Sequence, residues 1–203
     1  MKKTSQYKFP EYTSLTLEEI PTDNATNIKI INSFLKNSTP EKLTGSLYLE
    51  GDGGEIETIV NSLPDLLQLV TKEIVINSFE FNSAKSLSCI FSNAIKAEKL
   101  TLRHCTIKIN PDMFQSFRIY AFHSYNLQEI NLYWSARFNH ISNSNDYFRK
   151  EHIEILLKRI NETNMINKLK NIITKESWYP KNMMKSIIYE LGLDLTAQTF
   201  EKY

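Results

Sequence analysis

The chain has 203 residues, of which 41% are hydrophobic, with only 5 glycines and 6 prolines. This composition suits one folded domain with a sizeable core and excludes a disordered or collagen-like chain. Lys and Arg number 24 against 23 Asp and Glu, so the net charge of +1 gives no long-range attraction for nucleic acid or an anionic membrane.

The sequence predicts neither a membrane span nor a secretory signal. No apolar run approaches the ~18 residues that a transmembrane helix needs, and the basic start at Met1-Lys2-Lys3 is not followed by an apolar segment. The two cysteines, Cys89 and Cys105, are too few for a disulfide framework. We therefore expect a cytoplasmic protein, with a mitochondrial location as the alternative.

A short aliphatic–x–aliphatic pattern recurs along the chain and predicts β-strands. Its copies begin between 26 and 42 residues apart: Leu15-Thr16-Leu17, Leu47-Tyr48-Leu49, Ile74-Val75-Ile76, Leu100-Thr101-Leu102, Ile130-Asn131-Leu132 and, more weakly, Ile172-Ile173-Thr174. Spacings of this size indicate stacked strand–helix units, each of which buries its apolar face only against its neighbours.

The segments between these strands carry apolar residues at helical spacing. The predicted helical segments are residues 28–35, two short pieces on either side of Pro64, a helix capped by Ser83, a helix opening at Asn110-Pro111, a helix over about 146–163, and a last helix ended by Gly192. Met113, Phe114 and Phe117 follow Asn110-Pro111, and Phe114 and Phe117 are expected to fill the core.

Two connections are irregular, and neither marks a domain boundary. The run from Glu50 to Gly54 predicts a tight turn with positive φ, and the polar run Asn139–Asn145 predicts a loop within the longest gap. We predict a single domain over 1–203, with an atypical first unit or cap at 1–42, repeat units at 43–195, and a cap or tail at 196–203.

One unit matches a known repeat template at every position. Ala97-x-x-Leu100-x-Leu102-x-x-Cys105-x-Ile107 fits the leucine-rich-repeat pattern L-x-x-L-x-L-x-x-N/C-x-L. The aliphatic side chains would alternate toward a core, and the cysteine would turn inward where the chain leaves the strand and satisfy backbone groups in the bend. This predicts Cys105 as a structural thiol, and Cys89 as a buried thiol on the apolar face of its helix.

Several runs together resemble leucine-rich-repeat-like proteins of ciliated protists over about residues 60–195. The runs are Leu63-Pro64, Val70-Thr71-Lys72-Glu73-Ile74, Phe79-Glu80-Phe81-Asn82-Ser83, Ile90-Phe91, Cys105-Thr106-Ile107-Lys108, Leu127-Gln128-Glu129-Ile130-Asn131-Leu132, Leu169-Lys170-Asn171-Ile172 and Tyr189-Glu190-Leu191-Gly192-Leu193-Asp194. The resemblance implies a ribonuclease-inhibitor-like strand–helix solenoid without catalytic residues. The segment Asn139–Arg149 departs from the family pattern.

The residues that could carry chemistry are scattered. The four histidines, His104, His123, His140 and His152, fall in four different segments, and no Cys or His pair has metal-ligand spacing. The glycines at 51–54 lack the lysine of a phosphate loop and the spaced acids of a calcium loop. We therefore predict no enzyme, no catalytic residue, no cofactor and no metal. An enzyme that uses Cys105 or a histidine remains an alternative function to be tested.

The side chains between the aliphatic pairs predict a concave binding surface, because they point away from the helices. With their flanking neighbours, they give the candidate protein-binding residues Tyr48, Val75, Thr101, Arg103, Asn131, Tyr133 and Ile173. Tyrosine and arginine are common anchors of interfaces. The same residues also follow from strand propensity alone, so both interpretations stay open.

The fold class expected is α/β, a leucine-rich-repeat-like solenoid of five to six strand–helix units with a parallel strand ladder. The function expected is a non-enzymatic protein–protein interaction module that uses the concave strand face. Its partner would be another protein or a multiprotein assembly, with no nucleic acid and no membrane insertion. The alternative is a structural subunit of a large organelle or cytoskeletal assembly.

Overall fold

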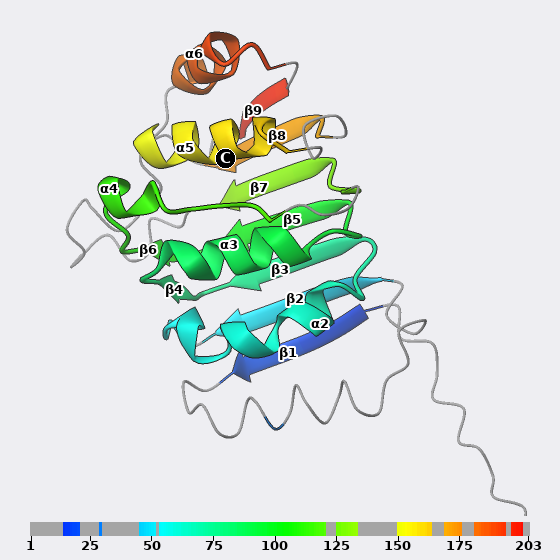
Figure 1. Cartoon of the computed structure of the whole chain (residues 1–203). Coiled ribbons are helices and arrows are strands. Elements are labelled where there is room, and N and C mark those ends of the chain that lie inside the picture. The colour runs from blue at the N-terminus through cyan, green and yellow to red at the C-terminus, as the bar shows by residue number, and fades with distance from the viewer. Residues whose placement is uncertain are drawn as a thin grey trace, which may run out of the picture.

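Seven strands of the chain pair side by side in a single parallel sheet. A computed structural model describes residues 14–20, 29, 45–51, 53–120, 125–133, 150–163, 169–175, 181–193 and 196–200. The strands pair in chain order (Figure 1): β1 (Ser14–Ile20), β2 (Ser46–Gly51), β3 (Glu73–Asn77), β5 (Lys99–Arg103), β7 (Glu129–Tyr133), β8 (Asn171–Lys175) and β9 (Thr196–Phe200). The predicted α/β class with a parallel sheet is confirmed.

The register places the aliphatic copies opposite one another. Leu15 pairs with Leu47, Leu47 with Ile74, and Ile74 with Leu100. Ile130 and Ile172 continue the same row on β7 and β8. Each repeat therefore contributes one strand to one ladder. Residues 196–203, expected as a cap or tail, include a seventh strand, β9, which the sequence pattern did not indicate.

A sharp bend follows each of the two central strands. Ser78 and His104, one residue beyond β3 and β5, both have left-handed backbones with φ of 58° and 52°. After the bend, β4 (Glu80–Phe81) pairs in parallel with β6 (Thr106–Ile107). The ladder also continues through the bend itself, since Ser78 N–H donates to the Arg103 carbonyl (2.9 Å). After β3 and β5 alike, the chain therefore runs from main strand through bend to short strand.

The helices begin and end close to the predicted signals. The described helical segments are η2 (Ile56–Thr58), η3 (Val60–Ser62), α2 (Pro64–Leu67), α3 (Ala84–Asn93), α4 (Pro111–Phe114), α5 (Lys150–Asn161) and α6 (Lys181–Glu190). Ser83 Oγ accepts from Lys85 N–H (3.1 Å), and Asn110 Oδ1 accepts from Asp112 N–H (2.9 Å), so both predicted N-caps are confirmed. Gly192 has a φ of 63° beyond α6, and the turn at Gly53 has a φ of 92°, as expected.

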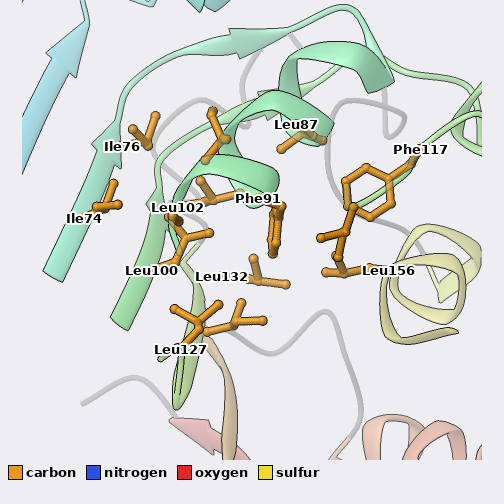
Figure 2. Close-up of a cluster of buried hydrophobic side chains, with 14 of the residues drawn as sticks. Ile74, Ile76, Leu87, Phe91, Leu100, Leu102, Phe117, Leu127, Leu132 and Leu156 are labelled. Carbon is orange, nitrogen blue, oxygen red and sulfur yellow. The ribbon is translucent and has the colours of Figure 1, made fainter. Parts of the chain in front are cut away.

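The core lies between the sheet and the helices α2, α3 and α5, which cover one face of it (Figure 1). Ile74, Leu100 and Leu132 point from their strands toward Phe91 of α3 (Figure 2), and all four are at most 1% exposed. Burying each such side chain contributes roughly 1.5–3 kcal/mol. The alternation of the strands therefore fixes which face of the sheet packs against the helices.

One helix is shorter than its spacing indicates. The helix α4 ends at Phe114, and the chain then lies extended along α3, where Ser88 Oγ accepts from Arg118 N–H (3.0 Å). Phe117 is still buried, with its ring centroid 5.6 Å from that of Phe91. Phe114 and Phe117 therefore fill the core as expected, whereas Met113, in the single turn of α4, is 61% exposed.

Three predicted segments lie outside the described residues. The expected helix at 28–35 is described only at Lys29. The expected loop Asn139–Asn145 is not described, and neither is Asp52 within the predicted turn from Glu50 to Gly54.

Candidate functional site

The side chains opposite the helix layer form three rows across β2, β3, β5 and β7. The register gives a first row at the start of the strands, a second in the middle and a third at their ends. We call these eleven residues the strand face: Glu73, Lys99 and Glu129; Tyr48, Val75, Thr101 and Asn131; Glu50, Asn77, Arg103 and Tyr133.

The first row is a chain of charges. Lys99 Nζ lies 3.4 Å from Glu73 Oε1 and 3.2 Å from Glu129 Oε1. Burial alone would lower the pKa of Lys99, but attraction to Glu73 and a hydrogen bond to Glu129 outweigh it, so the pKa is raised. All three side chains are partly exposed, and each ion pair therefore contributes less than about 1 kcal/mol. The row holds the three charged side chains in place but contributes little to the stability of the fold.

Side chains of the second row donate hydrogen bonds to the carboxylates of the first row. Thr101 Oγ1 donates to Glu73 Oε1 (3.0 Å), and Asn131 Nδ2 donates to Thr101 Oγ1 (3.2 Å) and Glu129 Oε1 (3.0 Å). Thr101 is 3% exposed and Asn131 is fully buried, although both were expected to line an open surface. Their side chains are short, and the longer ones of the flanking rows extend past them. These two residues position carboxylates and do not offer their own surface to solvent.

The third row pairs an asparagine with a carboxylate. Asn77 Nδ2 donates to Glu50 Oε1 (2.8 Å), and Asn77 is 4% exposed. At the other end, Arg103 is exposed and its Nε donates to His104 Nε2 (3.1 Å). Tyr133 is half-buried, and burial raises the pKa of its hydroxyl against the opposing effect of nearby Lys99.

Two amide oxygens of the strand face have no partner among the described residues. They are Oδ1 of Asn77 and Oδ1 of Asn131, and both are buried. The orientation of each amide is fixed, because a carboxylate only accepts hydrogen bonds and the NH₂ group must face it. An unsatisfied buried acceptor costs about 1–3 kcal/mol, so these two oxygens need an explanation.

The structure brings six of the seven predicted binding residues together on the strand face. Ile173 pairs with Asn131 from β8, but its side chain lies outside the described part. The binding role of all seven stays a prediction. The sequence analysis did not single out Asn77, although alternation from Val75 places it on the same face.

Both cysteines differ from catalytic thiols. Cys105 is 2% exposed, and its thiol donates to the Ile76 carbonyl (3.4 Å), so its predicted structural role in the bend is confirmed. Burial raises its pKa to about 12, against backbone hydrogen bonds that lower it. Cys89 is half-buried and not buried as expected, because it lies on the flank of α3; burial also raises its pKa.

A hollow lies on the helix side of the molecule. It has a volume of about 660 Å³, and α3 contributes Lys85, Cys89 and Asn93 to its lining. Gln68 and Tyr120 also line it, and Gln68 Nε2 donates to Asn93 Oδ1 (2.7 Å). The serine hydroxyls of its lining bond mostly to backbone groups, as Ser88 Oγ does to the Ala84 carbonyl (2.8 Å) and Ser116 Oγ to the Met113 carbonyl (2.7 Å).

Histidines and acids do not gather into a metal-binding group in the described part of the chain. No three His, Cys, Asp or Glu side chains lie close enough there to hold an ion together. His152 is fully buried, and its Nε2 donates to the Ile109 carbonyl (2.8 Å). None of the described helices is long and apolar enough to cross a lipid bilayer. Comparison with protein-family models, with curated proteins and with solved structures found no match to this chain.

Proposed function

We propose that the chain is a leucine-rich-repeat-like solenoid that binds another protein through its strand face and catalyses no reaction. The in-register parallel ladder supports the solenoid, since each unit adds one strand in chain order. The repeated left-handed bends at Ser78 and His104 support it further, because they recur at the same register position. Five to six units then stack with their helices on one side.

The binding role is proposed because the strand face combines accessible side chains with a fixed hydrogen-bond network. Tyr48, Val75 and Tyr133 are partly exposed and Arg103 is exposed, while the residues between them hold a fixed hydrogen-bond network. A rigid platform with accessible aromatic and arginine side chains needs little ordering when a partner docks. Such a platform is typical of repeat proteins that bind along their strands.

The state of the thiols supports a non-enzymatic role. A nucleophilic cysteine needs a lowered pKa and access to substrate. Cys105 has the opposite properties, with a raised pKa and 2% exposure. Labelling of the folded protein with a thiol reagent tests this, and rapid modification of Cys105 in the native state would contradict it.

Affinity capture from the native source, read by mass spectrometry, tests the binding role. We expect the triple variant Tyr48→Ala/Arg103→Ala/Tyr133→Ala to lose the partners that the natural chain retains. The matched control Lys85→Ala/Tyr120→Ala/Tyr189→Ala removes three exposed side chains that lie outside the strand face. This control should retain the partners. Partners that remain bound to the strand-face variant and leave the control would contradict the proposal.

A second candidate is a structural subunit of a large organelle or cytoskeletal assembly. Exposed apolar side chains outside the strand face favour it, since Met113 of α4 and Tyr120 of the extended segment are each 61% exposed and Tyr189 of α6 is 86% exposed. Sedimentation of the native complex separates the two: a large stable particle favours a permanent subunit, and a free or weakly associated chain favours the binding module.

A further inference from the structure

The two unpartnered amide oxygens share one arrangement. In each case the amide NH₂ is bonded to a carboxylate, from Asn77 to Glu50 and from Asn131 to Glu129. The free Oδ1 therefore lies beside a negative charge and accepts hydrogen bonds only. A donor that carries positive charge would satisfy both groups at once, whereas a carboxylate or a carbonyl would satisfy neither.

The charge of the strand face favours the same donor. Its carboxylates are Glu50, Glu73 and Glu129, against the cations Lys99 and Arg103, so its net charge is −1. Lys99 already bridges Glu73 and Glu129. Glu50 has no ion-pair partner within the described ranges, and it is the carboxylate that Asn77 holds in place.

We infer that the strand face recognises an extended segment of a partner protein that presents arginine or lysine side chains to Asn77–Glu50 and to Asn131–Glu129. This inference rests on the proposed function and adds the chemistry of the partner. Arginine fits best, because one guanidinium reaches an amide oxygen and the neighbouring carboxylate together.

The spacing of the two sites sets the spacing of the basic residues. Asn77 and Asn131 lie on strands separated by β5 and two residues apart in register. Strand spacing and rise place them roughly 12 Å apart. In an extended peptide, side chains four residues apart lie on one face at about 13 Å. Both oxygens are covered in this structure, and the flanking Glu129 and Tyr133 are partly exposed, so a docking side chain must displace its neighbours to reach them.

The probe is a labelled, acetylated and amidated peptide of seven residues with arginine at its second and sixth positions and serine or threonine between them. Fluorescence anisotropy at low ionic strength measures its binding to the full chain. We expect binding that is weakened by salt, roughly tenfold weaker with citrulline in place of arginine, and absent with glutamate there.

The variants are chosen to separate binding from folding. Asn77→Leu/Asn131→Leu removes both unpartnered oxygens at similar volume, and we expect roughly tenfold weaker binding of the arginine peptide. Glu50→Gln keeps an acceptor and loses only charge, so it reports on binding even where the double variant folds poorly; it should weaken binding several-fold. The helix-side variant Lys85→Ala should bind like the natural chain.

Equal binding of the arginine and glutamate peptides, or unchanged arginine binding by the asparagine and Glu50 variants, would overturn the inference. The proposed function fails separately. If native partners are captured through Tyr48, Arg103 and Tyr133 while the arginine peptide does not bind, the strand face binds proteins but not basic segments.

Discussion

Two successive units, β3 to α3 and β5 to α4, have matching strands but different helices. Main strand, bend and short strand recur in strict register, with Glu73 opposite Lys99 and Glu80 opposite Thr106. The helix α3 has 10 residues, whereas α4 has 4 and continues as an extended segment. Backbone hydrogen bonds between strands require register, while the helix layer only has to fill space with apolar side chains. The strands of the two units therefore have the same geometry, whereas their helical segments differ in length.

The largest expected effect on stability comes from the aromatic cluster of the unit with the shorter helix. Phe117 lies outside any helix, yet it is fully buried, and Phe114 stacks on it with ring centroids 5.1 Å apart. We expect Phe117→Ala to lower the free energy of unfolding by about 3–5 kcal/mol, as much as Phe91→Ala in α3. Chemical denaturation measures both.

The control for that measurement is Met113→Ala. Met113 is 61% exposed, so its loss should change the free energy of unfolding by less than about 0.5 kcal/mol. A small effect of Phe117→Ala would show that the extended segment is a surface loop and not a replacement for the helix.

The next test concerns the contact that ties one unit to the next. Glu57 Oε1 accepts from the backbone N–H groups of Asn82 (3.2 Å) and Ser83 (3.0 Å) and from Ser86 Oγ (2.7 Å). The carboxylate thus caps α3 from the preceding unit, where a negative charge is favourable. We expect Glu57→Ala to cost about 1–3 kcal/mol in thermal or chemical unfolding, more than Ser83→Ala, which removes a single capping bond. Equal costs would contradict a cap shared between units.

A third test compares equivalent positions in the bends. Phe79 fills this position in the first unit and Cys105 in the second, and both are buried. The pKa of Cys105 is raised from an ordinary value of 9.0 to about 12, so the folded chain holds its proton longer than the unfolded chain. This stabilisation is complete below pH 9 and is lost as the pH rises toward 12.

We expect the free energy of unfolding at pH 10 to fall by about 1.4 kcal/mol relative to pH 8 from this thiol. Burial also raises the pKa of Tyr125 to about 12, so the measurement is made in the natural chain and in Cys105→Ala. The variant should show the smaller fall. Identical pH profiles would mean that Cys105 titrates in the fold as it does in the unfolded chain.

The smallest effect is expected where the extended segment lies on α3. Ser92 Oγ accepts from Tyr120 N–H (2.9 Å), as Ser88 Oγ does from Arg118 N–H. Ser92→Ala should cost about 1 kcal/mol and speed amide exchange at Tyr120 by roughly fivefold. Exchange at Thr101, on the ladder, should stay unchanged; equal acceleration at both sites would indicate global destabilisation.

The strands and caps could be predicted because their signals are local. Period-two alternation placed Ile74 and Leu100 in the core, and Ser83 and Asn110 cap helices through their own side chains. The burial of Thr101 and Asn131 depends on longer side chains of neighbouring strands, which one strand's pattern does not contain. The carboxylate cap of Glu57 and the strand β9 likewise depend on contacts between units, so the sequence pattern did not reveal them.

The most direct test of the account places a photo-crosslinking amino acid at one tyrosine on each side. Benzoylphenylalanine replaces Tyr48, on the strand face, or Tyr120, on the helix side, and the protein is irradiated in its native extract. We expect a discrete partner adduct from position 48 and none from position 120. An adduct formed only from position 120 would contradict the claim that the strand side of the repeat makes the contacts.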